Sequence, residues 1–305
     1  DYIVPADAFP QGIPVEAHQA TITAGTVLTR DLVLETGSSL NAGTVINSDV
    51  QVKEVLVLNE ADFQRGFSHY DINGHSGVLV SQGSEVDVTM PLLRLAEGAF
   101  QTSAYDEALE AWQPELFLER PLDGELEQRG GASLALRSNL NGLGGTITVQ
   151  EDARLEVDPG QSLLLSGRNR LTVDGTLRAQ GGTIQVVSSL LTRVPARGPE
   201  DRIEIGENAV LDVSGLAYTA TDARGRRYGA VLDGGEVVLG AEAPEDFGDA
   251  NLYDTNNLFV VVREGALIDV SGASADLDLG QATPSTVASD GGSLAMRSNS
   301  GIYFD

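Results

Sequence analysis

The sequence predicts an all-β solenoid, in which short strands stack coil upon coil around one continuous apolar core. The main observation is a repeat within residues 144–187, where pairs of apolar residues recur every eight residues. Each pair encloses one residue that is mostly polar, so both apolar side chains point to the same face of a strand. The pairs are Ile147/Val149, Leu155/Val157, Leu163/Leu165 and Leu171/Val173.

The segments between these pairs have the composition of turns. They are Gln-Glu-Asp-Ala, Asp-Pro-Gly-Gln and Ser-Gly-Arg-Asn, which are rich in residues that favour tight turns. Strands and turns of about four residues each are too short for a sandwich of long strands, but they suit the sides and corners of a solenoid. The pattern therefore predicts that each strand pairs with its counterpart in the next coil.

Two short sequence segments that recur within the chain also indicate a repeat protein. The segment Ser133–Asn139 (SLALRSN) returns 160 residues later as Ser293–Asn299 (SLAMRSN), and Val210–Gly215 (VLDVSG) returns 57 residues later as Leu267–Gly272 (LIDVSG). Neither offset is a small multiple of eight, so we expect coils that carry loops of unequal length. With coils of about 20–27 residues, the chain would form about 11–15 coils.

The chain divides into four parts by its residue pattern. Residues 1–20 carry three of the 11 prolines and no alternation, so we expect an extended segment leading into the coils. Residues 21–100 are predicted to form β-helix coils, interrupted at 61–80 by several aromatic residues and two histidines. Residues 101–131 are predicted to be an insertion, and residues 132–305 further coils with long loops.

The insertion is predicted to contain one short helix. Tyr105, Leu109 and Trp112 follow one another at helical spacing on one face, with acidic residues toward the start of the run. Pro114 would end this helix. We expect Tyr105 and Trp112 to belong to a small core of the insertion. The alternative is that these two residues form a platform on which a sugar ring stacks.

The composition excludes several classes of function. A formal net charge of -26 and a pI near 4.2 disfavour binding to nucleic acid or to an anionic membrane surface, because either would need a basic face. The sequence contains no run of about 18 apolar residues, which a membrane-spanning helix would need. Cysteine is absent, which excludes disulfide bonds and zinc-thiolate sites.

Nearly all the positive charge is arginine, because Lys53 is the only lysine. Arg224, Arg226 and Arg227, followed by Tyr228, form one basic cluster within a polar loop. This cluster is interpreted as a solvated loop. The alternative is a contact surface for an acidic sugar or an acidic neighbouring chain.

Candidate metal ligands are few. His69, Asp71 and His75 could offer two imidazoles and a carboxylate, but the Asn-Gly turn between the histidines favours an ordinary loop. Asp246, Asp249 and Asp254 are candidate ligands for weakly bound calcium, although they lack the spacing of known calcium-binding nonapeptide repeats. We expect no other cofactor.

The order of several segments resembles the filamentous-haemagglutinin-like large exoproteins of Gram-negative bacteria. The segments are FSHYDINGHSG and SEVDVTMPLLR, then WQPELF and EQRGGASLALRSN, and finally GALIDVSG and GGSLAMRSNSGIYFD. The resemblance extends from about Thr21 onward. It implies a right-handed parallel β-helix, secretion to the cell surface or exterior through an outer-membrane two-partner transporter, and a role in adhesion.

Together these observations predict a structural and adhesive shaft segment, without enzymatic activity. Because the chain opens at Asp1 without a leader and closes within an alternating segment, we expect a piece of a longer polypeptide. Its expected partners are host or bacterial surface glycans or proteins, in attachment, cell–cell contact or biofilm.

Two alternatives remain open. One is a polysaccharide lyase or hydrolase built on a β-helix, which would need acids from adjacent coils to converge in one groove. The chain has no Asp-Asp pair, and its acids stand mostly singly at turns. The other alternative is a subunit of a self-assembling extracellular filament, in which the shaft packs against copies of itself.

Overall fold

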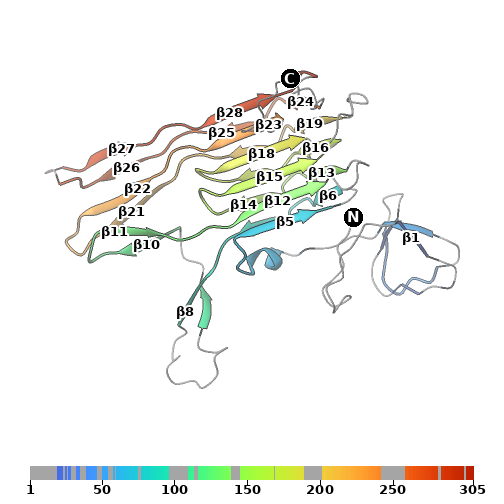
Figure 1. Ribbon diagram of the computed structural model, residues 1–305, viewed down its shortest axis with the longest axis horizontal. Coiled ribbons are helices and arrows are strands. Elements are labelled where there is room, and N and C mark those ends of the chain that lie inside the picture. The colour runs from blue at the N-terminus through green and yellow to red at the C-terminus, as the bar shows by residue number, and fades with distance from the viewer. Residues whose placement is uncertain are drawn as a thin grey trace, which may run out of the picture.

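The structure is a computed structural model, and it is all-β apart from one short 3-10 helix, η1 (Glu60–Gln64), among the residues it describes (Figure 1). The described residues are 19–22, 25, 27–28, 32–34, 39–46, 50–53, 58, 60–74, 77–95, 109–112, 116–138, 145–167, 169–188, 201–241, 258–280, 283–298 and 300–305.

Three parallel sheets form the body of the protein. The first sheet contains β5 (His69–Asn73), β12 (Ser133–Ser138), β15 (Ser162–Gly167), β18 (Thr183–Ser188), β23 (Glu236–Ala241) and β28 (Ser293–Arg297). The second contains β6 (Gly77–Val80), β13 (Thr146–Val149), β16 (Arg170–Val173), β19 (Arg202–Ile205), β24 (Phe259–Val262) and β29 (Ile302–Phe304). The third contains β7 (Glu85–Val88), β14 (Arg154–Val157), β17 (Thr176–Arg178), β20 (Val210–Asp212) and β25 (Leu267–Asp269).

The chain visits the three sheets in turn. We call each set of consecutive strands from the first, second and third sheet a rung; β12, β13 and β14 form one. The described residues contain six rungs, and the last consists of β28 and β29. This is fewer than the 11–15 expected, because long excursions between sheets take up much of the chain. The stacked parallel sheets are consistent with the predicted solenoid.

The eight-residue repeat corresponds to one side of a rung. Ile147 pairs with Leu171 in the next rung, so three sides of eight residues complete one circuit at this point. The predicted pairs fill the core, as expected from their alternation, and all eight side chains are at most 2% exposed. They are Ile147, Val149, Leu155, Val157, Leu163, Leu165, Leu171 and Val173.

The recurring sequence segments occupy equivalent positions on different rungs. Val210 in β20 pairs directly with Leu267 in β25, so the 57-residue offset is one circuit. The segments that begin at Ser133 and Ser293 form β12 and β28 of the same sheet. The circuits between these strands differ in length because their loops are unequal, as the offsets predicted.

The N-terminal strands pair differently from the prediction. β1 (Gln19–Ile22), β2 (Leu32–Leu34), β3 (Ser39–Leu40) and β4 (Val50–Lys53) form a separate sheet in which every pairing is antiparallel. The prediction of coils in this region is therefore wrong, because alternation of period two is common to both pairing directions. Residues 61–80 do not interrupt the coils either, since they supply η1, β5 and β6.

The predicted helix in the insertion is also wrong. Leu109–Trp112 forms the strand β9, which pairs antiparallel with β8 (Leu92–Leu95), and Leu92 lies opposite Trp112. A helix of so few turns has little stability alone, whereas β8 provides partners for the backbone of β9. Tyr105 lies outside the described residues. The insertion continues with β10 (Phe117–Arg120) and β11 (Glu125–Gln128), which form an antiparallel hairpin.

Besides the β8–β9 pair, three hairpins leave the rungs at the same corner, between the third sheet and the first. They are β10–β11, β21 (Ala217–Thr221) with β22 (Arg227–Val231), and β26 (Ser274–Leu277) with β27 (Ser285–Ala288). The hairpins extend side by side from the rungs (Figure 1). Ala223 N donates to Pro121 O at 2.9 Å, and Asp278 N donates to Arg227 O at 2.8 Å. We call these three hairpins the hairpin stack.

The two ends of the rung stack differ. At the first rung, Phe63 of η1 is buried against the core, and its ring lies 5.7 Å from that of Tyr70. At the last rung, the side chains of Leu294, Ile302 and Phe304 are 44%, 38% and 66% exposed. Their counterparts one rung earlier are almost fully buried in the core. The first rung is therefore covered, and the last presents core-type side chains.

Candidate functional site

Glu204 is the centre of a cluster of ion pairs on the rung stack. It lies in β19 between Ile203 and Ile205, which are both fully buried, so its side chain projects from the outer face of the second sheet. Parallel register places Arg170 of β16 beside Arg202 of β19. Arg263 follows β24, and its backbone N donates to Ile205 O at 2.9 Å. Each of three successive rungs thus places one arginine beside the same carboxylate.

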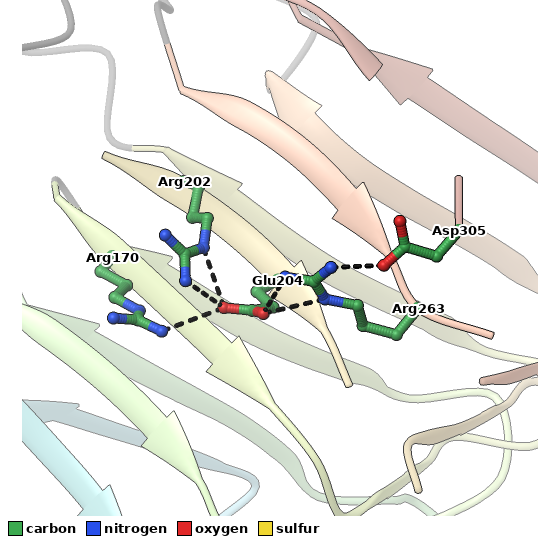
Figure 2. Close-up of polar contacts among 5 residues, drawn as sticks. All are labelled: Arg170, Arg202, Glu204, Arg263 and Asp305. Carbon is green, nitrogen blue, oxygen red and sulfur yellow. Dashed lines mark hydrogen bonds and ion pairs between the residues drawn. The ribbon is translucent and has the colours of Figure 1, made fainter. Parts of the chain in front are cut away.

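Both oxygens of Glu204 are used. Oε2 accepts from Arg170 Nη2 at 3.0 Å and pairs with Arg202 Nη2 at 2.8 Å, while Oε1 accepts from Arg263 Nη2 at 2.9 Å. Figure 2 shows these contacts together with the ion pair between Arg263 and Asp305. Only 12% of the Glu204 side chain is exposed. Charge-assisted hydrogen bonds of this kind fix the positions of all the groups involved.

The arginines control the charge of Glu204. Burial raises the pKa of its carboxyl, but hydrogen bonds from Arg263, Arg202 and Arg170 outweigh burial and hold the pKa below its ordinary value. The Asp305 and Glu204 hydrogen bonds raise the pKa of Arg263 in turn. Glu204 therefore stays ionised at neutral pH, where it cannot donate a proton as a general acid.

An open depression of about 440 Å³ surrounds this cluster. Acids from four successive rungs contribute to its lining, which is the arrangement that the enzyme alternative requires. Asp174 is held in place by the backbone N of Asn208, which donates to its Oδ1 at 3.1 Å. The lining residues are Arg170, Thr172, Asp174, Glu204, Gly206, Glu207, Arg263, Glu264 and Asp305.

Two aromatic residues lie next to the cluster on the same outer face. Phe259 of β24 pairs in register with Arg202, and Tyr303 of β29 lies one rung further. The two ring centroids are 5.9 Å apart, with an interplanar angle of 56°. The Tyr303 side chain is 54% exposed. Rings and charged groups thus share one surface.

Sequence reasoning did not identify the Glu204 cluster. The alternation Arg202-Ile203-Glu204-Ile205 predicts that Arg202 and Glu204 face outward together. The other two arginines are 34 and 59 residues away from Glu204 in the sequence. Only the register between rungs could show that they meet.

The third sheet carries a similar ladder of outward charges. Arg178 lies between Glu156 and Asp212 of the neighbouring rungs, with its Nε 3.1 Å from Asp212 Oδ2 and its Nη1 3.9 Å from Glu156 Oε1. Arginine can reach two carboxylates in different directions, because its guanidinium carries five donors in a planar fork. This use of arginine fits a chain with a single lysine.

The four residues of the predicted basic cluster lie together on the hairpin stack. Arg224 and Arg226 belong to the turn between β21 and β22, and Arg227 and Tyr228 begin β22. Asp222 organises this turn: its Oδ1 accepts from the backbone N of Arg224 at 2.8 Å and of Arg226 at 2.9 Å. These hydrogen bonds, led by that of Arg226, lower the pKa of Asp222.

The members of this cluster differ in their surroundings. Arg224, Arg226 and Arg227 are all exposed, and Arg226 pairs with Asp222 at 2.8 Å. Tyr228 is half-buried, and burial raises the pKa of its hydroxyl, with a further contribution from the negative charge of Glu119. The three arginines are therefore all accessible to a partner, although Arg226 is already paired with Asp222.

The remaining candidates lie elsewhere. Asp246, Asp249, Asp254 and His75 are outside the described residues, as is the side chain of Trp112. Asp71 pairs with Arg137 at 3.2 Å. Among the residues that the structure describes, no group of three or more His, Cys, Asp or Glu side chains could hold a metal ion.

No helix in the described part of the chain is long and apolar enough to cross a membrane. No family model matches the chain, and no curated protein or solved structure is significantly similar to it.

Proposed function

We propose that this chain is the shaft segment of a secreted bacterial surface protein of the filamentous-haemagglutinin-like exoprotein type. In this proposal the rungs form a right-handed parallel β-helix, and its surfaces and projecting hairpins mediate attachment, cell–cell contact or biofilm formation. The observation that carries the proposal is the order of the strands, which passes through three stacked parallel sheets around one apolar core.

The stacked rungs support a mechanical role. Each rung contacts only its neighbours and adds about 4.8 Å to the stack, so the architecture extends a protein along one direction. The hairpin stack leaves this body at a single corner, and segments that project from a repetitive scaffold are common sites of binding. The shaft would thus present a long surface to other cells.

The proposed partners are surface glycans or proteins, with an outer-membrane transporter acting during secretion. The net charge of -26 favours neutral or cationic partners over polyanions. We propose no enzymatic activity and no cofactor beyond weakly bound calcium.

Binding of the purified chain to bacterial cells, host cells and a glycan array, with and without calcium, tests this function. We expect retention on at least one cell surface in the presence of 0.15 M salt. A chain that binds no cell, glycan or surface protein would contradict an adhesive role.

The acid-lined depression favours one alternative, a β-helix enzyme that cleaves polysaccharides. Such enzymes need one carboxyl that donates a proton and another that acts as base or nucleophile. Glu204 is unsuited to the first role, because its pKa is lowered. Release of reducing ends from a polysaccharide, lost in the variants Asp174→Asn or Glu207→Gln, would establish the enzyme.

The other alternative is a filament subunit, in which a copy of the chain stacks on the last rung. Leu294, Ile302 and Phe304 would be buried if a copy of the chain stacked on this end. A sedimentation coefficient that rises with protein concentration would support this alternative.

A further inference from the structure

The outer face of the second sheet carries a straight column of side chains that runs along the stack. The parallel register places one residue of the column on each of six rungs, about 4.8 Å apart. We call this set the outer column: it consists of Leu79, Thr148, Thr172, Glu204, Val261 and Tyr303. A linear polymer of rings could follow it across several rungs.

The ends of the outer column are apolar and accessible. Tyr303 is 54% exposed beside Phe259, and Leu79 at the opposite end is 61% exposed. Aromatic side chains offer a large flat contact area and lose little conformational entropy on binding. An exposed tyrosine face is therefore suited to the apolar face of a sugar ring.

The middle of the column is polar and already ordered. Thr172, Glu204 and Arg263 line the depression, where the side chain of Arg263 is 40% exposed. Because Arg263 is fixed by Glu204 and Asp305, its rotamer entropy is lost before any ligand arrives. Held in this way, its guanidinium can donate to sugar hydroxyls, and Glu207 and Glu264 can accept from them.

The charge of this face indicates what kind of polymer it can accept. The lining of the depression includes five carboxylates but only two arginines, and the whole chain carries a net charge of -26. A uronate-rich or sulfated polymer would be repelled. A neutral polymer rich in hydroxyl groups fits both the charge and the side-chain chemistry.

We propose that the outer face of the second sheet binds a neutral linear polysaccharide lying along the outer column. Tyr303 and Phe259 contact the sugar rings, while Thr172 and Arg263 bond to hydroxyl groups. This inference rests on the proposed adhesive function, and it names the face and the ligand class of that function.

The experiment is affinity gel electrophoresis of the purified chain at pH 7 through gels that contain glucomannan, hydroxyethyl cellulose or alginate. We expect retardation by at least one of the two neutral polymers and none by alginate. Tyr303→Ala should weaken the apparent affinity about tenfold, and the isosteric Thr172→Val about threefold or more. Tyr303→Phe retains the ring and should stay close to wild type.

Matched variants separate this face from the hairpin stack. Leu122→Ala removes an exposed apolar side chain from the turn between β10 and β11, and it should leave retardation unchanged. If Arg224→Ala with Arg227→Ala abolishes retardation and Tyr303→Ala does not, the ligand lies on the hairpin stack. That result would overturn the inference but leave the adhesive function standing.

Two further results would also overturn the inference. Retardation by alginate as strong as that by the neutral polymers would contradict the charge argument. A chain that no polysaccharide retards but that still coats cells would be an adhesin for another ligand, whereas a chain that does neither would contradict the proposed function as well.

Discussion

Asp158, a buried carboxylate that follows β14, binds both ends of the longest excursion between described rungs, which connects β7 to β12. Its Oδ2 accepts from Met90 N after β7 and from Ala132 N before β12, both at 2.9 Å. Its Oδ1 pairs with Arg129 at 2.5 Å, and the side chains of Asp158 and Arg129 are 1% and 5% exposed. This one carboxylate thus accepts hydrogen bonds from two backbone N–H groups and pairs with one arginine side chain.

We predict that Asp158→Asn lowers the free energy of unfolding by about 3 kcal/mol, because it removes the negative charge from a buried ion pair with Arg129. Urea denaturation followed by circular dichroism measures this change. Asp152→Asn is the matched control: Asp152 lies in an exposed turn at φ 59°, a conformation that asparagine tolerates. Equal stability of the two variants would contradict the role of Asp158.

The lowered pKa of Glu204 makes its contribution to stability dependent on pH. A carboxyl whose pKa is depressed by folding stabilises the protein fully above its ordinary value of 4.5 and loses that effect as pH falls through the lower folded pKa. We therefore expect Glu204→Gln to be less stable than wild type at pH 7. The difference should shrink below about pH 4.5. Chemical denaturation across this range measures it, and a difference that does not vary with pH would refute the linkage.

At the scale of elements, glycine pairs mark where the strands of the first sheet begin. Gly181-Gly182, Gly234-Gly235 and Gly291-Gly292 precede β18, β23 and β28. A Cβ on Gly292 would lie 1.8 Å from Gly235 O, and one on Gly235 would lie 1.9 Å from Gly182 O. The corner therefore requires glycine, because the backbones of successive rungs approach too closely for any side chain.

We predict that Gly292→Ala lowers the free energy of unfolding by about 2 kcal/mol, because the backbone carbonyl that it meets bonds to the next rung. The adjacent Gly291→Ala is the control, since its Cβ would have one ordinary contact, at 3.5 Å from Val270 O. Thermal unfolding of both variants distinguishes them. If the Gly292→Ala and Gly291→Ala proteins had the same melting temperature, the steric explanation would be excluded.

The elements also show where sequence reasoning reached its limit. The strands of the central rungs were predictable, because each has two inward apolar residues between turn residues. Leu109–Trp112 was not, because its apolar residues have helical spacing and the local sequence does not show that it pairs with β8. Pairing direction was likewise hidden in β1 to β4, since alternation carries no information about it.

At the scale of the whole molecule, charge and the uncovered last rung oppose each other. The net charge of -26 keeps copies apart, while the exposed side chains of Leu294, Ile302 and Phe304 favour contact. Association of the chain should therefore depend on how strongly salt screens the charge.

We predict that the sedimentation coefficient at high protein concentration rises between 0.05 and 0.5 M salt, roughly the range over which the Debye length falls from well above to below 10 Å. Phe304→Asp should abolish this rise, because it adds charge to the apolar end. The control is Leu122→Asp, which adds the same charge to an exposed hairpin turn. An identical rise in all three proteins would show that the last rung is not the contact.

The sequence by itself determined the all-β class, the buried pairs of the central rungs and the corners between them, because these depend on alternation and turn residues within a few positions of one another. It also determined the charge that disfavours polyanions. Only the tertiary structure decided which strands pair antiparallel, where the hairpins stack, and that Arg170, Arg202 and Arg263 meet at Glu204. These features depend on the register between rungs, which loops of unequal length set and which no local pattern encodes.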